Sequence, residues 1–182
     1  MSSTGRHPRP WFERTFANDM PLSHSVNLAA RLAGAPARLE ELVRDVSVAA
    51  RTSRVDGEWS IQENAGHLLD LESLWQVRLD EMLAGVDTLT PADLENNATH
   101  QARHNERSAG ELLAAFRATR EGWVARVDAL SGDDFGRVAL HPRLGQPMRV
   151  VDLLAFVAEH DDHHLARIRQ LRRELVELPA GR

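Results

Sequence analysis

The amino-acid sequence predicts an all-α protein, a four-helix bundle with a long crossover between its second and third helices. Ala, Leu, Arg and Glu dominate the 182 residues, and aromatic residues make up only 5%, which favours helices. Apolar residues recur at helical spacing in four separate segments. Residues 86–107 form a connection long enough to carry the chain from one end of a bundle to the other, so the second and third helices can run parallel.

Composition limits the classes of function. The chain has a net charge of −5, so it lacks the basic surplus that neutralises a phosphate backbone, and we expect no nucleic-acid partner. It contains no cysteine, which excludes a disulfide framework, a cysteine-ligated zinc finger and a cysteine nucleophile. The N-terminus lacks the apolar segment of a signal peptide, and no apolar stretch is long enough to span a bilayer. We expect a cytoplasmic protein without a membrane partner.

Two parts of the chain are predicted, an extended N-terminal arm at residues 1–21 and the bundle domain at residues 22–182. The arm contains prolines and has no helical period. Trp11, Phe12 and Phe16 would form an adhesive patch if all three were exposed. We therefore expect them to pin the arm to the body of the protein, with a mobile tail as the alternative.

The first helical region extends from about residue 22 to residue 50, with a kink or break at Gly34 and Pro36. The second helix begins with a capping box, Ser60 followed by Glu63, and ends at Gly85. Between these ends it carries a stripe of apolar residues at helical spacing: Ile61, Ala65, Leu68, Leu71, Trp75, Leu79 and Met82.

A second capping box, Ser108 with Glu111, begins the third helix, and Trp123 lies on its apolar face. Residues 131–147 are predicted to be irregular and to include a turn at residues 141–145. The fourth helix extends from about residue 150 to residue 177, with a continuous apolar stripe: Val150, Leu153, Leu154, Val157, Ile168, Leu171 and Leu175.

His160 and His164 lie within the apolar stripe of the fourth helix. They are four residues apart, so their imidazoles project from adjacent turns of one face, the spacing at which two histidines share a metal ion. Two unpartnered imidazoles in an apolar core would be costly, and a metal removes that cost. His67 lies at the margin of the stripe of the second helix. Spacing alone leaves a helix-surface histidine cluster as the alternative to a metal site.

Four further residues are candidates for the surroundings of this site. His163 lies about 120° from the stripe centre, so it cannot easily bind the same ion; we place it at the bundle edge or beside the ligands, with solvent exposure as the favoured interpretation. Asp161 lies nearer the inward face and could orient a ligand imidazole, although a solvated carboxylate is an equal alternative. Asp70 projects about 160° from its stripe and is a poor candidate for a general base. Trp59 could form a pocket wall, but we favour a hydrophobic anchor at the helix start.

Three histidines lie in the predicted loops. His100, His104 and His141 could each reach the mouth of the bundle. His104 or His141 could be a fourth metal ligand or a substrate contact, although a surface loop position is the favoured interpretation of both.

Two motifs resemble those of a known family. Residues 59–70, WSIQENAGHLLD, resemble the second-helix motif of the DinB/YfiT-like superfamily, and residues 159–165, EHDDHHL, resemble its fourth-helix motif. The resemblance covers roughly residues 22–175, with the helix order and the long second loop of that family. It implies a four-helix bundle in which His67, His160 and His164 bind one divalent metal ion near one end. Members of that family are often homodimers, so the resemblance also implies a homodimer. Related members are described as metal-dependent hydrolases or as S-transferases that use a low-molecular-weight thiol.

Three imidazoles without a thiolate or a carboxylate suit Zn²⁺ or Ni²⁺ best, with Fe²⁺ and Cu²⁺ as further options, and do not suit Mg²⁺ or Ca²⁺. Three protein ligands leave a coordination position open, as catalysis requires. Our first hypothesis is an S-transferase, in which the ion activates a bacillithiol- or mycothiol-like thiol towards an electrophilic small molecule. Arg103, Arg143 and Arg149 could then hold the carboxylates of the thiol, with ordinary surface arginines as the alternative.

The second hypothesis is a hydrolase, in which a metal-bound hydroxide attacks an amide or an ester. It requires a general base near the metal, and the sequence offers no obvious one, although Glu159 and Asp161 flank His160. The third hypothesis is a non-catalytic stress protein that binds a metal or a small ligand. An additional protein ligand that fills the coordination sphere would favour it.

Overall fold

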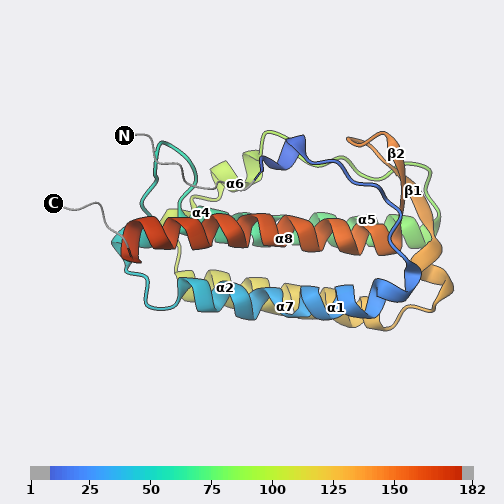
Figure 1. Cartoon of the computed structure of the whole chain (residues 1–182), viewed down its shortest axis with the longest axis horizontal. Coiled ribbons are helices and arrows are strands. Elements are labelled where there is room, and N and C mark those ends of the chain that lie inside the picture. Colours follow the sequence, from blue (N-terminus) through green and yellow to red (C-terminus); the bar gives the residue numbers. More distant parts are fainter. Residues whose placement is uncertain (1–8, 178–182) are drawn as a thin grey trace.

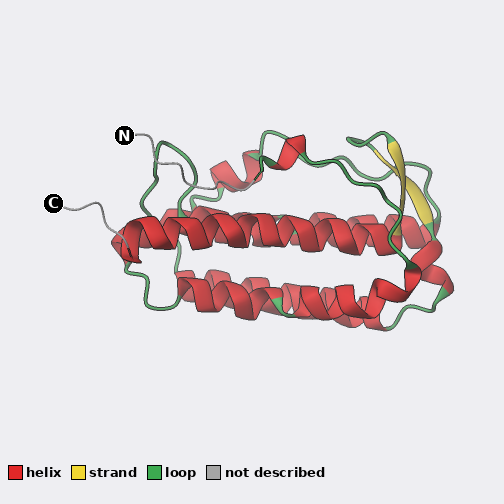
Figure 2. Ribbon diagram, in the orientation of Figure 1, coloured by secondary structure: helices red, strands yellow, loops and turns green. Residues whose placement is uncertain are grey.

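The computed structural model describes residues 9–177, and in these residues four long helical segments lie side by side as a bundle (Figures 1 and 2). The first segment consists of α1 (Ser25–Ala33) and α2 (Ala35–Val43), and the second of α4 (Ile61–Asp70) and α5 (Glu72–Ala84). The third is α7 (Ala109–Asp128) and the fourth is α8 (Val150–Arg172), which continues as a π-helical turn, η5 (Arg173–Glu177). The last five residues of the predicted domain, 178–182, lie outside the described residues.

The predicted break in the first segment is confirmed, because α1 ends against Gly34 and α2 begins with Pro36 in its first turn. The segment ends earlier than predicted, at Val43, and a turn with Asp45 at a φ of 59° follows. A separate short helix, α3 (Val48–Arg51), then begins at Ser47, whose hydroxyl accepts a hydrogen bond from the third following backbone N–H. The sequence between Val43 and Ser47 holds neither proline nor glycine, so composition gave no sign of this break.

The capping box of the second segment is confirmed in full. Ser60 Oγ accepts a hydrogen bond from the Glu63 backbone N–H at 3.1 Å, and Glu63 Oε2 accepts one from the Ser60 N–H at 2.9 Å. Gly85 ends α5 with a φ of 77°, as predicted. The predicted single helix is nevertheless divided at Leu71, which separates α4 from α5 at a ψ of −9°.

The crossover returns the chain across the length of the bundle. Figure 1 shows that α4, α5 and α7 run in one direction, whereas α1, α2 and α8 run in the other. The crossover also contains a short helix, α6 (Asn97–Gln101), and a 3-10 turn, η3 (His104–Glu106). Both pack against α4. As a result α4 is enclosed on two sides, and all residues from Ile61 to Leu68 are buried.

Residues 131–147 are more ordered than predicted. After a 3-10 turn, η4 (Asp133–Gly136), they form most of an antiparallel hairpin of β1 (Val138–His141) and β2 (Gln146–Arg149). The predicted turn at residues 141–145 joins the strands, with Gly145 at a φ of 64°. The fold is therefore a helical bundle with a small two-stranded sheet. Each strand has only 4 residues, too few to show a clear alternation of apolar and polar residues in the sequence.

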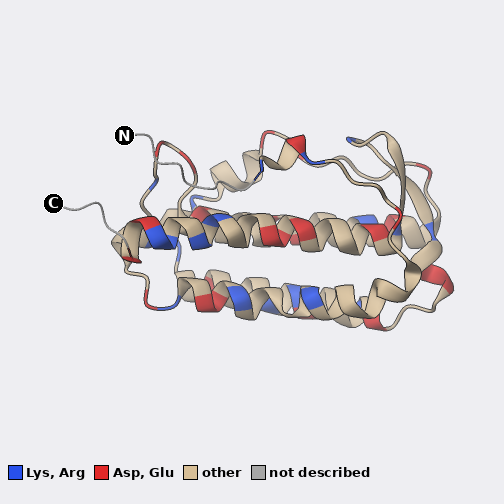
Figure 3. Ribbon diagram, in the orientation of Figure 1, with Lys and Arg blue, Asp and Glu red and all other residues tan. Residues whose placement is uncertain are grey.

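The core is divided along the bundle axis. One apolar cluster surrounds Trp75 and Trp123, which the sequence placed in the core, and the other surrounds Ile61 and Phe116. Between the two clusters lies a polar layer of buried charged and histidine side chains from all the long segments except the first: His67, Glu72, Arg120, His160, Asp161 and His164. On the outside, acidic residues near the middle of α8 face basic residues on α1 and α2 (Figure 3).

The described part of the arm, residues 9–21, lies along the body as predicted. It contains a 3-10 turn, η1 (Trp11–Glu13), and a second 3-10 turn, η2 (Leu22–His24), leads from it into α1. Trp11 and Phe16 pack on Phe156, with ring centroids 5.1 Å and 4.8 Å away. Phe12 is 57% exposed, so it does not serve as a buried anchor. Residues 1–8 of the predicted arm lie outside the described residues. None of the described helices is long and apolar enough to cross a membrane.

Candidate metal centre

His67 from α4 and His160 and His164 from α8 converge in the polar layer. One ring nitrogen of each lies within 4.8 Å of those of the other two, close enough for one metal ion to engage all three. All three side chains are buried. The structure thus brings together the three histidines that the sequence singled out as ligands. In the described part of the chain, neither His104 nor His141 belongs to this group.

The hydrogen bonds of two of these rings fix which nitrogen is free. His164 Nδ1 lies 2.9 Å from Asn64 Oδ1, and because an amide oxygen only accepts, Nδ1 must carry the proton. The Asn64 amide group in turn donates to the backbone oxygens of Trp59 and Ser60, which holds the oxygen towards His164. The Nε2 lone pair of His164 is therefore available to a cation.

A chain of hydrogen bonds has the same effect on His67. Thr99 Oγ1 donates to Asp70 Oδ2 at 2.8 Å, so its single proton is used, and it can only accept from His67 Nδ1, 2.9 Å away. The Nε2 of His67 is then also free. Asp70, a poor candidate for a general base from its direction on the helix, thus acts on the site through Thr99 instead. This is possible because the crossover covers the outer face of α4.

The site passes a test of fit for a divalent cation. Burial lowers the pKa of His67 to about 4, against the opposing effect of Asp70, and it lowers the pKa of His160 and His164 well below the ordinary value. All three imidazoles are therefore neutral at pH 7, which is the form that binds metals. In addition, His160 Nδ1 is buried without a hydrogen-bond partner in the described residues.

The histidines form part of the wall of a cavity of about 790 Å³. Trp59 also lines it, with its ring centroid 4.8 Å from that of His67 and 6.2 Å from that of His164. Trp59 is therefore a pocket wall, and our preference for a simple helix anchor was wrong. On the other side, the Trp11 ring meets His160 edge-on at 5.0 Å, so the arm contributes to the same wall. No local sequence signal indicated this contact, because Trp11 is remote from both ligand motifs.

His163 is half-buried rather than exposed as predicted, because the arm covers it. Its Nδ1 lies 3.4 Å from Arg14 Nη2, and its ring is 5.9 Å from that of Trp11. It also lines the cavity, although it is not one of the three grouped histidines.

The loop histidines differ from the surface positions that we favoured. His104 is buried, with Nε2 2.8 Å from Asp70 Oδ2 and its ring directly against Gly66. It supports Asp70 and does not line the cavity. His141 is also buried and lines the cavity, with Nε2 3.2 Å from Arg78 Nη1. His100 is exposed, but it reaches the cavity, as we expected of this loop.

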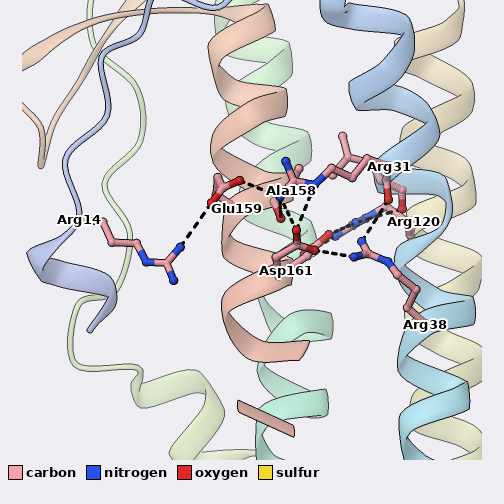
Figure 4. Close-up of polar contacts among 9 residues, drawn as sticks. Arg14, Arg31, Arg38, Arg120, Ala158, Glu159 and Asp161 are labelled. Atoms are coloured by element: carbon pink, nitrogen blue, oxygen red, sulfur yellow. Dashed lines mark hydrogen bonds and ion pairs between the residues drawn. The ribbon is translucent and has the colours of Figure 1, made fainter. Parts of the chain in front are cut away.

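The carboxylates that flank His160 are engaged by arginines (Figure 4). Asp161 accepts hydrogen bonds from Arg120 Nη1 at 2.5 Å and from Nη2 at 3.1 Å. Glu159 accepts from Arg31 Nη2 at 2.7 Å. The hypothesis that Asp161 orients a ligand imidazole is wrong, because its oxygens face Arg120. The alternative of a solvated carboxylate is also wrong, because Asp161 is buried.

Among the three arginines proposed to hold a cosubstrate, only Arg143 lines the cavity. Arg149 instead hydrogen-bonds Asp152 and the backbone oxygen of Met20, and it thereby fastens the arm. Arg103 is exposed and forms an ion pair with Glu106.

Comparisons with known proteins agree with this geometry. A Bacillus licheniformis protein named "putative metal-dependent hydrolase" is 24% identical over 119 residues, which cover 65% of this chain and 68% of that protein. The solved structure of YfiT from Bacillus subtilis, described as "a probable metal-dependent hydrolase with an unusual four-helix bundle topology", superposes with a TM-score of 0.79. It is 21% identical, and the match covers 88% of this chain and 93% of YfiT.

A protein from Streptococcus pneumoniae superposes with a TM-score of 0.64 at 15% identity, covering 90% of this chain and 94% of that one. These structural matches identify the four-helix fold. The family model of the DinB superfamily matches residues 31–168, more than half of the chain. The protein therefore belongs to the DinB superfamily.

Proposed function

We propose that the protein is a divalent-metal-dependent hydrolase of a small molecule that binds in the cavity beside the three histidines. The observation that carries the proposal is the convergence of His67, His160 and His164, as neutral imidazoles, on the wall of that cavity. The names of the relatives from B. licheniformis and B. subtilis support the same class of activity. Hydrolysis is thereby preferred to the S-transfer that we placed first from the sequence.

Different residues would bind the ion and orient its ligands. His67, His160 and His164 would hold the ion, and when bound it would supply a Lewis acid and lower the pKa of water at its open positions. Thr99 and Asn64 keep the ring protons of His67 and His164 away from the ion, so that both imidazoles present lone pairs. The donor set favours Zn²⁺ or Ni²⁺, with Fe²⁺ or Cu²⁺ as alternatives.

The surrounding rings control the environment of the reaction. Trp59 and Trp75 lie 4.8 Å from His67 and 5.7 Å from His160, respectively, and Trp11 meets His160 from the arm. Apolar rings around the imidazoles reduce the number of water molecules that compete for the site. They also provide flat surfaces for an apolar part of the substrate.

Metal analysis of matched variants tests the proposal. Protein stripped with a chelator and reloaded with Zn²⁺ or Ni²⁺ should hold about one ion per chain. His160→Ala should hold almost none, whereas His163→Gln, altered on the same helix but outside the group of three, should match the wild type. Hydrolysis of a panel of esters and amides should then rise with metal occupancy. Equal metal content in wild type and His160→Ala would overturn the proposal.

A second candidate is transfer of an electrophile to a low-molecular-weight thiol. The observation that favours it is the size of the cavity, about 790 Å³, which lies in the upper part of the range for small-molecule sites and could admit two reactants. The metal-loaded protein would be incubated with a model electrophile and bacillithiol or mycothiol. A conjugate that forms faster than the electrophile hydrolyses would favour transfer over hydrolysis.

Two further expectations stay predictions, a cytoplasmic location and a homodimer. Sedimentation equilibrium of the full chain tests the second, since a dimer doubles the monomer mass of 20.3 kDa.

A further inference from the structure

Two arginines lie together at the end of the cavity beyond Trp75. Arg78 belongs to α5, three residues after Trp75, which places it about 4.5 Å further along the helix axis. Arg143 belongs to the turn of the β1–β2 hairpin. Both line the cavity, and His141, the last residue of β1, links the hairpin to Arg78, with its Nε2 3.2 Å from Arg78 Nη1. The Arg143 guanidinium carbon lies 5.5 Å from the ring centroid of Phe12 and 5.9 Å from that of Phe156, an arrangement that holds a cation on aromatic faces.

Neither guanidinium has a carboxylate as a hydrogen-bond partner in the described residues. Arg78, only 1% exposed, donates from Nε to the Thr90 backbone oxygen at 3.0 Å, and its Nη2 is buried without a partner. Arg143 has no hydrogen bond or ion pair to any described side chain or backbone group, and its Nη2 is also buried and unpartnered. Arg120, the other arginine that is buried in the described residues, contrasts with Arg78 and Arg143, because it is matched by two carboxylates.

The electrostatic effects on these groups agree with an unmatched positive charge. Burial lowers the pKa of Arg143. Burial, together with the nearby Arg143 and against the effect of Glu81, lowers the pKa of Arg78 to about 10, so both stay charged at pH 7. The Glu81 carboxylate is already used by the backbone N–H and the hydroxyl of Thr90. Burial and the two arginines lower the pKa of His141 to about 4, so it is neutral and adds no third charge.

We propose that this end of the cavity binds the anionic group of the substrate, an oxyanion such as a carboxylate or a phosphate, with Arg143 as the hydrogen-bond donor and Arg78 as a fixed charge behind it. The inference rests on the proposed function, in which this cavity receives the substrate. A buried cation without a counter-charge is costly, and an entering oxyanion removes that cost. Guanidinium groups also match the geometry of carboxylate and phosphate oxygens.

The same geometry describes the rest of the substrate. The stretch of wall between the arginines and the histidines is apolar, because it consists of Leu71, Trp75 and Phe156. His160 meets Trp75 at 5.7 Å, and Arg78 follows about one turn later. The substrate class is therefore a small organic acid or phosphate ester with an apolar middle, and with its hydrolysable bond at the end opposite the anionic group.

Titration calorimetry of the metal-free, full-length protein tests the anion site. The probes are 4-phenylbutyrate and its neutral isostere 4-phenylbutanamide, which differ in charge and hardly in shape. The carboxylate should bind at least about tenfold more tightly, the effect expected of a charge-assisted hydrogen bond. Arg143→Gln should abolish this preference, whereas Arg103→Gln, an exposed arginine outside the cavity, should retain it. Phenyl phosphate as a third probe would identify which oxyanion the site prefers.

Equal affinity of the two isosteres for the wild type would overturn the inference, and this comparison needs no variant to fold. Retention of the preference in Arg143→Gln would also overturn it. Because the protein is metal-free, the result is independent of the histidine site. A preference for the acid together with unchanged metal content in His160→Ala would leave the anion site standing and remove the proposed function.

Discussion

Replacement of Arg120 by methionine should destabilise the protein more than any surface substitution. Arg120 lies in the polar layer between the two apolar clusters and is fully buried, and Glu72 and Asp161 are each 1% exposed. It donates to Glu72 from Nε at 3.1 Å and from Nη2 at 2.5 Å, and to Asp161 at 2.5 Å and 3.1 Å. The Arg120→Met variant leaves two buried carboxylates without their common cation.

The magnitude follows from this count. Loss of one partner from a buried ion pair costs about 3–5 kcal/mol, and Arg120 serves two carboxylates, so we expect the upper end, about 5 kcal/mol. For a domain of this size each kcal/mol lowers the melting temperature by about 2–4 °C, which gives a fall of roughly 10–20 °C. Such a loss is a large share of the 5–15 kcal/mol that typically stabilises a folded domain.

The assay is urea unfolding of metal-free protein, followed by circular dichroism, with Arg126→Met as the matched control. Arg126 lies on the same helix and pairs with Asp80, but both are exposed, so its loss should cost less than about 1 kcal/mol. A triple variant, Arg120→Met with Glu72→Leu and Asp161→Leu, should recover most of the lost stability, because no buried charge is left unpaired. Equal losses for Arg120→Met and Arg126→Met would refute the reasoning, as would a triple variant no more stable than the single one.

Three further predictions concern α4. A Cβ at Gly66 would lie 2.2 Å from His104 Cγ, so Gly66→Ala should destabilise by about 1–3 kcal/mol in thermal unfolding, whereas Gly122→Ala, in open space on α7, should stabilise by up to about 1 kcal/mol. Burial raises the pKa of Glu63, but hydrogen bonds from Arg54 and the helix cap lower it to about 2. The contribution of Glu63 to the free energy of unfolding is therefore present above pH 4.5 and is lost as the pH falls to 2. Wild type should therefore lose up to about 3 kcal/mol in that window, measured by urea unfolding, and Glu63→Gln should lose less. Asp70→Asn should weaken Zn²⁺ binding, measured by competition with a chelator, by about tenfold or more.

Each of these has an outcome that would count against it. Equal effects of the two glycine substitutions would mean that His104 yields to the added methyl group. Parallel stability curves for wild type and Glu63→Gln between pH 6 and pH 2 would remove the role assigned to that carboxylate. An unchanged Zn²⁺ affinity in Asp70→Asn would show that the chain through Thr99 does not orient His67.

Local signals predicted much of the fold. The capping box at Ser60, the glycine at position 85 and the stripe on α8 each depend on neighbours within a few residues, so the sequence contains their cause. The polar layer between the two apolar clusters has a different origin, because it is built from three chain segments and has no signature in any one of them.

The metal ligands could be predicted from the sequence, but the residues that hydrogen-bond and orient them could not. His160 and His164 follow from spacing four residues apart, and His67 from the motif around it. Thr99, by contrast, lies in a polar crossover without periodicity, and its approach to His67 is a tertiary contact. The burial of His104 was missed because the crossover was taken to lie on the surface, whereas α6 and η3 pack against the outer face of α4. The same packing lets Asp70 meet Thr99 and His104.

The chain segments that form the cavity walls determine how substrate specificity can change. The three histidines belong to the packed helices α4 and α8, but much of the rest of the wall comes from segments outside the bundle: Trp11 and Phe12 from the arm, His100 from the crossover and Arg143 from the hairpin. Such segments tolerate substitution and insertion far better than packed helices do. Selection or engineering could therefore replace one substrate with another by altering the connections, while the reactive centre and the folding core stay as they are.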